Sequence, residues 1–362
     1  MGVVGDSVRK VSWRIVRLLL LAALVSPSMI ACTSEDETAS PTISAPPATL
    51  NAGCSVSELL VPSCGAWLGS SIPSADGKWD ITAGLEEYES ATGDQPEILR
   101  FFQRGPKVFP TSAHIAAAER PGRPRSLLHF SWKPAPELTW RQIANGVADT
   151  SIEAVASQLA KYPHRMFFTV HHEPENDVEL SEGSGMTPAD YVDMYRHVVD
   201  KLRSSGSDNL VFVMVYIGFH RWANLVDDLY PGDDVVDWIG YDPYGFAAQT
   251  DFAALLNRPT PESGWPGFYS WATGRSDKPI MVAEWGFDLI DAPDAANVLS
   301  GAPVILEDQF PQIKALVYWN GTGRTLNTRL DQPGDAAARF ATAFAEMAAD
   351  PWFNSTSTVD AP

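Results

Sequence analysis

The sequence lacks several features that whole classes of protein require. It has three cysteines in 362 residues and no paired CxxC motif, so nothing in it predicts a zinc site. No glycine-rich phosphate loop follows its first apolar run. Basic residues are scarce, because 26 Lys and Arg stand against 45 Asp and Glu, for a net charge of −19. Such a surface repels nucleic acid and anionic lipid headgroups, whereas a neutral ligand is compatible with it.

Long hydrophobic runs are also missing, apart from one near the N-terminus. Four basic residues precede LLLLAALV at 18–25, and a region of small residues follows and ends at Ala31. This order is typical of a secretory leader, and the run is too short to span a membrane as a mature helix. We expect residues 1–31 to be removed and the mature chain to leave the cytoplasm.

The end of this leader resembles the cleavage box of bacterial lipoproteins, in which the cysteine becomes the lipidated N-terminus. Cys32 has Ala31 before it and Thr33 after it, although Met29 stands where Leu is usual. An ordinary signal peptide cut nearby is the alternative. We expect Cys32 to carry lipid, so that the protein is extracellular or at the cell surface and touches the membrane only through this anchor.

Residues 32–52 are rich in Ser, Thr, Pro and acid, and they predict a flexible tether. If Cys32 carries lipid, Cys54 and Cys64 remain as a pair in an oxidising compartment, where a disulfide that closes their short loop is the simple inference. Removing residues 1–31 takes away four basic and one acidic residue, which changes the net charge from −19 to −22.

After the tether, short apolar runs alternate with helical patterns, as in a parallel sheet covered by helices. Several runs are continuously apolar, as strands buried on both faces should be. Eight candidate strands are found, at 65–70, 97–103, 126–132, 165–172, 209–216, 235–242, 279–286 and 313–320.

Helices are expected between these strands. The clearest begins at TPAD, with Thr187 as N-cap and Asp190 completing a capping box. Others are expected at 151–162 and 335–349. Eight strands with intervening helices predict a single (β/α)8 barrel over residues 53–352, with a tail at 353–362. An open doubly wound sheet is the competitor, and the missing phosphate loop argues against it.

Catalytic groups of a (β/α)8 barrel lie where the strands end and the loops begin. The fourth predicted strand ends in His171-His172-Glu173, the sixth in Asp242-Pro243-Tyr244, the seventh in Glu284-Trp285-Gly286 and the eighth in Tyr318-Trp319-Asn320. Two carboxylates from different strands at one barrel mouth are what glycoside hydrolysis needs, one to protonate the leaving oxygen and one to attack or to activate water. Glu173 and Glu284 are that pair. The alternative for each is a strand-end glutamate paired with Arg or Lys.

The segment YPGDDVVDWIGYDPYG at 230–245, with HHEP before it and KPIMVAEWGF after it, resembles glycoside hydrolase family 26. Weaker similarity covers nearly the whole folded region. The resemblance implies a retaining barrel enzyme in which Glu173 is the general acid/base and Glu284 the nucleophile. It further implies that His172 is the active-site histidine, that Tyr244 lies near the nucleophile, and that Trp319 forms a platform under the sugar.

Three further residues remain open at this stage. Asp242 is expected to bind substrate with the residues above. Trp132, at the end of the third predicted strand, either lines the same cleft or is a core tryptophan. His171 and Glu173 could instead be metal ligands, but no third ligand is evident. We therefore expect neither a metal nor another cofactor.

The sequence departs from mannan-cleaving members of the family around the acid/base. Thr169-Val170 replace an Arg-Pro pair, and no aromatic-rich run follows Glu173. The fifth predicted strand ends in Val215-Tyr216-Ile217-Gly218 rather than Trp-x-Pro-Asn. The expected activity is retaining hydrolysis of a neutral β-linked polysaccharide by a monomer, with β-1,4-mannan first and β-glucan or xylan next. A lipoprotein that binds glycan without cutting it is the competing class.

Overall fold

The strands of this computed structural model form a closed parallel barrel. The structure describes residues 54–72, 80–245, 251–323 and 326–353, so the predicted leader, Cys32 and the tether lie outside the described residues. The barrel strands are β1 (Trp67–Ser71), β2 (Ile98–Arg104), β3 (Leu127–Lys133), β4 (Met166–Val170), β5 (Leu210–Tyr216), β6 (Trp238–Tyr241), β8 (Ile280–Phe287) and β9 (Ile313–Trp319). Neighbours pair in that order, and contacts of β6 with β8 and of β1 with β9 close the ring. All eight predicted strands and the barrel are thus confirmed.

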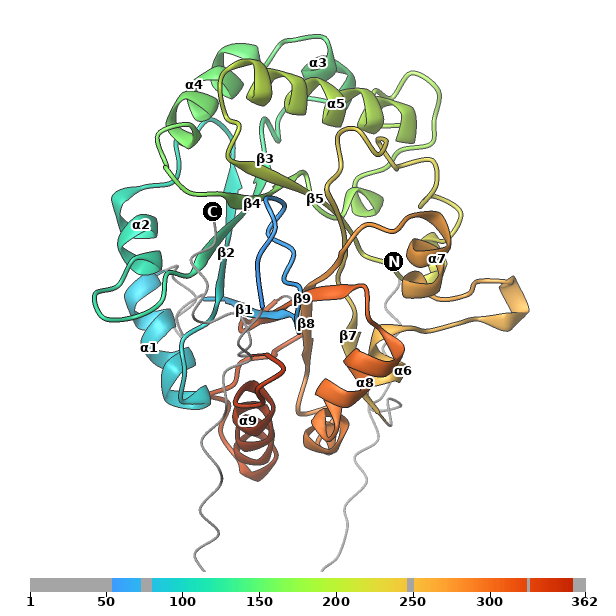
Figure 1. The fold of residues 1–362 in the computed structure, drawn as a ribbon. Coiled ribbons are helices and arrows are strands. Elements are labelled where there is room, and N and C mark those ends of the chain that lie inside the picture. The colour runs from blue at the N-terminus through green and yellow to red at the C-terminus, as the bar shows by residue number, and fades with distance from the viewer. Residues whose placement is uncertain (1–53, 73–79, 246–250, 324–325, 354–362) are drawn as a thin grey trace, which may run out of the picture. The chain divides into compact units, whose positions relative to one another are not determined.

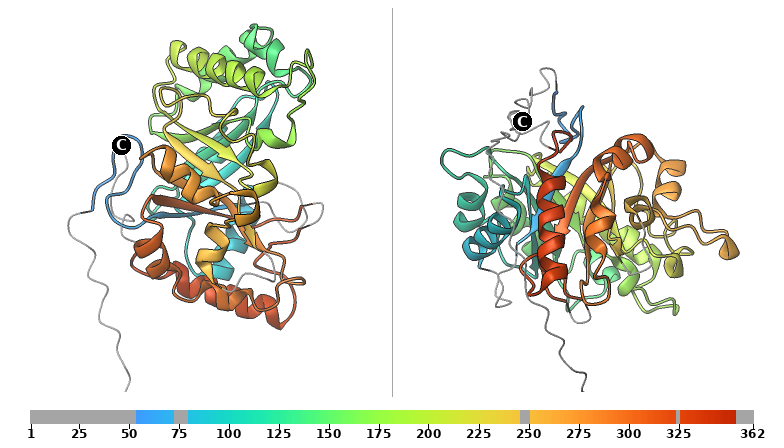
Figure 2. Two further views of the ribbon diagram at one scale, coloured as in Figure 1. Left: turned by 90° about the vertical axis from the view of Figure 1, so that its right-hand side faces the viewer. Right: turned by 90° about the horizontal axis from the view of Figure 1, so that it is seen from below.

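Helices lie around the outside of the strands (Figures 1 and 2). They are α1 (Ile81–Thr92), α2 (Ser112–Ala118), α3 (Trp140–Ala144), α4 (Asp149–Leu159), α5 (Pro188–Ser204), α6 (Phe252–Leu256), α7 (Phe268–Arg275), α8 (Ala302–Gln309) and α9 (Asp335–Ala348). Thr187 caps α5 and Asp190 completes its capping box, as the sequence predicts. A two-residue strand, β7 (Tyr244–Gly245), pairs with the end of β8. No helix among the described residues is long and apolar enough to cross a membrane.

Alternation along the strands separates two apolar cores. In β5, Val211, Val213 and Val215 belong to the smaller core inside the barrel, while Phe212 and Met214 pack in the larger core between strands and helices. Successive side chains of a strand point to opposite faces, so a strand buried on both faces needs apolar residues throughout. This is why the runs read as continuously apolar in the sequence.

The segment before β1 closes the amino-terminal end of the barrel. Leu60 is fully buried in the inner core. The indole N–H of Trp67 donates to the Leu60 carbonyl at 2.8 Å, and that of Trp238 donates to the Leu59 carbonyl at 2.7 Å. The predicted disulfide between Cys54 and Cys64 is confirmed and spans this segment. It constrains the chain on the face opposite the strand ends that carry Glu173 and Glu284.

The C-terminal helix packs on the outer face of β8 and β9. The Phe344 ring lies 5.7 Å from the Trp285 ring and 4.9 Å from the Tyr318 ring. Phe353, the first residue of the predicted tail, is 1 % exposed, so the folded chain extends at least to that position. The two aromatics beside the strand ends, Trp285 and Tyr318, are therefore core residues that fix these strands.

Candidate active site

The end of β4 turns sharply to present Glu173. His171 and Glu173 have φ values of 48° and 52°, in the left-handed region that side chains other than glycine rarely adopt. The turn is held from both sides, because the His171 N–H donates to the Trp132 carbonyl at 2.8 Å and the Glu173 N–H donates to the Val215 carbonyl at 2.9 Å. Strain of this kind persists only where the surroundings fix it, and it clusters at functional sites.

Glu284 lies inside the barrel mouth on β8 and is held by hydrogen bonding. It is 7 % exposed, and the Tyr244 hydroxyl donates to its Oε2 at 2.6 Å. Burial, and then the charge of Glu284, holds the pKa of Tyr244 well above its usual range, so the phenol keeps the proton that it donates. The structure thus places Tyr244 where the resemblance implies it should be.

Arg100 is a buried cation that the sequence prediction missed. It projects from β2 into the barrel, where its Nη1 lies 3.4 Å from Glu284 Oε1 and 3.9 Å from Asp242 Oδ1. Ser131 accepts hydrogen bonds from its Nε and Nη2, and the Ala283 carbonyl accepts one from its Nη1. A buried charge is stable only when it is paired, so Arg100 and the carboxyl groups stabilise one another.

Three carboxyl groups meet in front of this arginine. Glu173, Asp242 and Glu284 each contribute an oxygen, and these oxygens lie within 4.8 Å of one another. Such a group could also hold a cation, but the Arg100 guanidinium already supplies positive charge there. Oxygens of the two glutamates that lie within 4.8 Å of each other fit the retaining arrangement, because inverting enzymes keep their carboxyl groups about 6.5–9.5 Å apart to leave room for a water.

Asp242 is buried close to both glutamates rather than exposed on the surface of a cleft. It is 1 % exposed, and neither of its oxygens accepts a hydrogen bond from any described residue. Burial, and then the negative charge of Glu284, holds the pKa of Asp242 well above its usual range. A protonated Asp242 can donate to Glu173, so its place in the site is as a neighbour of the catalytic carboxyl groups.

Glu173 has the properties of a general acid. Burial, followed by the charge of Glu284, raises its pKa to about 7. The Asn176 side chain donates to Glu173 Oε2 at 3.0 Å and orients the carboxyl group. The two glutamates therefore differ in surroundings, because Glu284 faces Arg100 and Tyr244 whereas Glu173 has no cation at hydrogen-bond distance among the described residues.

His172 and Trp319 lie together at the mouth and are partly exposed. The Phe102 ring packs edge-on against both, at 5.3 Å from each ring. The His172 ring makes no hydrogen bond to any described residue, and burial holds its pKa well below its usual range, so a neutral imidazole is available to a ligand. Gly321 fits against the Trp319 indole, where a Cβ would lie 2.9 Å from the ring. Both residues are thus placed to contact a sugar.

His171 is part of the scaffold, not a metal ligand. It bonds Asp177 Oδ2 through Nε2 at 2.8 Å, and the Trp140 indole donates to its Nδ1 at 3.3 Å. Lys133 also bonds Asp177, at 2.7 Å. Both ring nitrogens are therefore occupied, and burial lowers the pKa of His171 to about 4. The network fixes the turn before Glu173.

The prediction that Trp132 could line the cleft is wrong. Its side chain is fully buried, and its indole N–H donates to the Gly105 carbonyl at 2.9 Å. It packs edge-on against Phe109 and Phe168 in the outer core. Trp132 alternates with inward residues along β3 and points toward the helices, so it cannot contact a ligand at the barrel mouth.

The sequence contained a feature that could have identified Arg100 as a site residue, but none that could have identified Asn176. Arg100 interrupts the apolar run of β2 at a position that alternation assigns to the barrel interior. A buried arginine requires a carboxylate partner, so the sequence contained a pointer to a buried acidic site. Asn176 contacts Glu173 only because of the left-handed turn and the short 3-10 helix η1 (Pro174–Asn176). No pattern in the sequence predicts this turn or this helix.

A closed (β/α)8 barrel with two glutamates close together at the carboxyl ends of its strands is the arrangement that retaining glycoside hydrolases use. Residues 143–259 match the sequence model of glycosyl hydrolase family 26. That region contains Glu173, Asp242 and Tyr244, and Glu284 and Trp319 complete the same site from β8 and β9. This part of the chain therefore matches glycosyl hydrolase family 26, the family that the sequence resembles.

Similar proteins agree with this assignment. Endoglucanase H of Acetivibrio thermocellus is 24% identical over 299 residues, which cover 79% of this chain and 31% of that protein. A ruminal GH26 endo-β-1,4-mannanase superposes with a TM-score of 0.51 at 18% identity, over 79% of this chain and 63% of that one. A β-mannanase from a symbiotic protist of the termite Reticulitermes speratus gives 0.53 at 13% identity, over 85% and 97%. The structural likenesses show the fold, and the chain spans less than two thirds of the first two proteins.

The raised pKa of Glu173 predicts the alkaline side of the pH profile. For a substrate with a poor leaving group, kcat/KM should fall as pH rises through about 7, because ionised Glu173 cannot protonate the leaving oxygen. An aryl glycoside of low phenol pKa needs little protonation and should lose this decline. The two profiles are measured on one enzyme preparation, and a poor-leaving-group profile that stays flat well above this pH contradicts the assignment.

Proposed function

We propose that this protein is a retaining glycoside hydrolase that cleaves a β-linked polysaccharide. The observation that carries the proposal is the meeting of Glu173 and Glu284 oxygens within 4.8 Å at the carboxyl ends of β4 and β8. Their separation suits a covalent glycosyl-enzyme, and their unequal surroundings suit an acid and a nucleophile. The family model that matches residues 143–259 and the related endoglucanase support the same reaction.

In the first step, Glu284 attacks the anomeric carbon while Glu173 protonates the leaving oxygen. Tyr244 and Arg100 hold the two Glu284 oxygens, so the nucleophile keeps one orientation. In the second step, ionised Glu173 takes a proton from water, which attacks the glycosyl-enzyme and frees Glu284. Trp319 offers an indole face to the apolar face of the sugar, and His172 offers a ring nitrogen to a hydroxyl group.

β-1,4-Mannan is the first substrate class that we propose. Three structural neighbours are described as β-mannanases, among them one complexed with gluco-manno-oligosaccharide. A β-glucan is the second class, since the curated relative is named an endoglucanase. The loop after Glu173 lacks the aromatic residues that follow the acid/base in mannan-cleaving members, so the leaving sugar needs other contacts.

Product release from a panel of polysaccharides tests the activity and identifies the sugar. β-Mannan, mixed-linkage β-glucan and xylan are incubated with the protein, and reducing ends and oligosaccharides are measured. Mannan or β-glucan should be cleaved with retention at the anomeric carbon, which NMR of the fresh products reveals. Binding to a glycan without release of product would instead identify a glycan-binding protein and would defeat the proposal.

We also propose that the mature protein is a lipoprotein held at the cell surface through Cys32. The sequence of its leader supports this, together with the Ser/Thr/Pro-rich tether that follows. Cys32→Ser should leave the folded domain intact and release it from the membrane fraction, because the lipid is the proposed membrane contact. Fractionation after a salt wash measures this, with Ser40→Ala as a control that changes a nearby residue but leaves Cys32 and the disulfide in place. A Cys32→Ser protein that stays in the membrane contradicts the anchor.

A further inference from the structure

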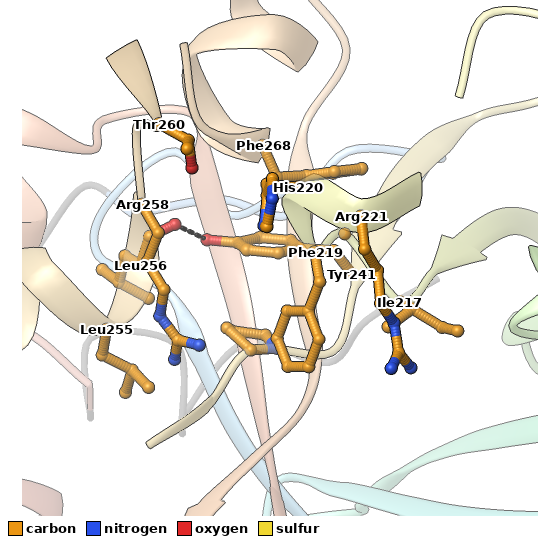
Figure 3. Close-up of a pocket in the computed structure, with 12 residues that line it drawn as sticks. Ile217, Phe219, His220, Arg221, Tyr241, Leu255, Leu256, Arg258, Thr260 and Phe268 are labelled. Carbon is orange, nitrogen blue, oxygen red and sulfur yellow. Dashed lines mark hydrogen bonds between the residues drawn. The ribbon is translucent and has the colours of Figure 1, made fainter. Parts of the chain in front are cut away.

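A cavity of about 310 Å³ lies beside Tyr241 and Pro243, the two sequence neighbours of Asp242 (Figure 3). It lies beyond the carboxyl ends of β5 and β6. Its walls come from the segment after β5, from the end of β6 and from α6, α7 and the loop between them. A volume at the lower end of the range for small-molecule sites suits one sugar ring rather than a longer stretch of polysaccharide.

The cavity adjoins the acid/base through two backbone connections. The Glu173 N–H donates to the Val215 carbonyl, and Ile217, two residues further along, lines the cavity. Glu175 Oε1 accepts a hydrogen bond from the Ile217 N–H at 2.9 Å, which ties the cavity wall to the turn that carries Glu173. Because Glu173 must reach the leaving oxygen, we infer that the leaving part of the substrate lies beside the Glu173 turn, to which this cavity wall is bonded.

Positive charge gathers at this cavity in a chain whose overall charge is strongly negative. Arg221, Arg258 and His220 line it, and none of the described lining residues carries a carboxylate. In Figure 3 the Arg221 and Arg258 guanidinium groups extend the same way, on either side of the Phe219 ring. Arg221 is exposed and forms no ion pair with any described residue. The exposed Arg221 guanidinium, in a lining where no described residue carries a carboxylate, favours an anionic ligand.

Glu175, whose carboxyl group bonds the cavity wall at Ile217, does not cancel this positive charge. Burial raises the pKa of Glu175 to about 8, so this group is mostly neutral near pH 7. Burial lowers the pKa of Arg258 only to about 10, so its guanidinium remains charged. Arg258 also donates to the Tyr244 carbonyl and lies over the Phe219 ring at 5.4 Å.

The body of the cavity is apolar and aromatic. The Phe268 and Tyr241 rings stack with centroids 4.6 Å apart, and the Tyr241 hydroxyl donates to the Leu256 carbonyl at 2.7 Å. Phe219 is partly exposed at the edge, next to the two guanidinium groups. Aromatic faces cover the apolar face of a pyranose, while the arginines suit a carboxylate carried on the same ring.

We propose that this cavity binds a uronic acid residue of the glycan on the leaving-group side of the cleavage point. The inference rests on the proposed function and specifies its substrate as a mostly neutral β-linked polysaccharide that carries carboxylate sugars. A polysaccharide with few uronic acid residues is compatible with the net charge of −19 of the protein. Repulsion between the acidic protein surface and the polysaccharide grows with the total charge of the polysaccharide, whereas the cavity contacts a single carboxylate.

Direct binding tests the cavity without requiring turnover. Glu284→Gln protein, with methyl β-D-glucuronate, methyl β-D-glucoside or the methyl ester of the glucuronate as probe, is followed by calorimetry or NMR titration. The glucuronate should bind best, and Arg221→Gln in the same background should weaken it roughly tenfold, as expected for the loss of one charge-assisted contact. Arg123→Gln, which removes an exposed arginine beside Glu89 and Asp94, serves as the matched control. Equal affinity for glucuronate and glucoside overturns the inference.

Kinetics on a matched pair of polysaccharides separate this inference from the proposed function. Two forms of the polysaccharide that the enzyme cleaves are compared. The first carries uronic acid residues, and in the second the carboxyl groups of these residues have been chemically reduced to alcohols. Arg221→Gln should lower kcat/KM roughly tenfold on the first and leave it unchanged on the second. Cleavage of both forms with equal efficiency by the unmutated enzyme refutes the uronate site but leaves the hydrolase intact. Glucuronate binding without cleavage of any glycan refutes the hydrolase but leaves the site intact.

Arg258 is expected to behave differently from Arg221. Its guanidinium also bonds the Tyr244 carbonyl, so Arg258→Gln should disturb the residue that holds Glu284 and should lower kcat on both forms of the substrate. Arg221 has no such connection among the described residues, which makes it the specific probe of the cavity. An Arg221→Gln protein that loses activity equally on both forms contradicts the assignment of Arg221 to uronate binding.

Discussion

Glu284→Ala should abolish turnover on every substrate. Without the nucleophile no glycosyl-enzyme can form, and losses on the order of 10⁵-fold in kcat are typical when a covalent catalyst is removed. Good leaving groups do not help, because the missing step is the attack and not the protonation. Hydrolysis of both an aryl glycoside and the polysaccharide identified by the panel is measured.

The matched control for this variant is Asp291→Ala, an exposed acidic residue in the turn that follows β8. It removes a carboxylate from the segment that follows the same strand and should retain full activity, with an unfolding temperature close to that of the original protein. A Glu284→Ala protein that is folded and still active places the nucleophile elsewhere. Glu284 is buried against Arg100, so thermal unfolding of the variant must be checked before its activity is interpreted.

Glu173→Ala should affect the two steps of the reaction unequally. An aryl glycoside of low phenol pKa needs little protonation, so the glycosyl-enzyme still forms. Its breakdown becomes slow because Glu173 must also act as base toward water, and the intermediate accumulates as an initial burst of phenol. On the natural polysaccharide, whose leaving group needs the acid, activity should fall by about 10²–10⁴-fold. Stopped-flow release of phenol measures the burst.

Azide provides the decisive second readout for Glu173→Ala. This small anion can enter the space left by the side chain and needs no base, so it should speed turnover and give a β-glycosyl azide. Glu179→Ala, an exposed residue after the same turn, is the control and should show neither burst nor rescue. If azide instead rescued Glu284→Ala to an α-glycosyl azide and left Glu173→Ala unaffected, the two assignments would have to be exchanged.

Much of the fold followed from local patterns. The eight strands were predictable because strands of a parallel barrel are buried on both faces and read as continuous apolar runs. Helix α5 was predictable because its N-terminus satisfies its free N–H groups with Thr187 and Asp190, which lie three residues apart in the sequence. The disulfide followed from the count of cysteines and their compartment.

The sequence also determined which residues stand at the strand ends. Glu173 and Glu284 each follow an apolar run, and in a barrel all strands end at the same face, so the two glutamates were expected to meet. The resemblance to the family then assigned Tyr244 a place near the nucleophile, which the bond to Glu284 bears out in position. These inferences needed only the order of residues and the geometry of a closed parallel sheet.

Only the tertiary structure decided how each side chain points and what lies beside it. Trp132 and Arg100 both stand in apolar strands, yet one faces the helices and the other faces the carboxyl groups. The cavity beside Arg221 and Arg258 joins segments from three parts of the chain. Strand alternation is fixed only once the register of the sheet is known, and contacts between distant segments depend on loop paths that local patterns do not specify. For that reason the sequence determined the barrel and which two glutamates meet at its mouth, while the structure alone decided the charge, depth and neighbours of the site.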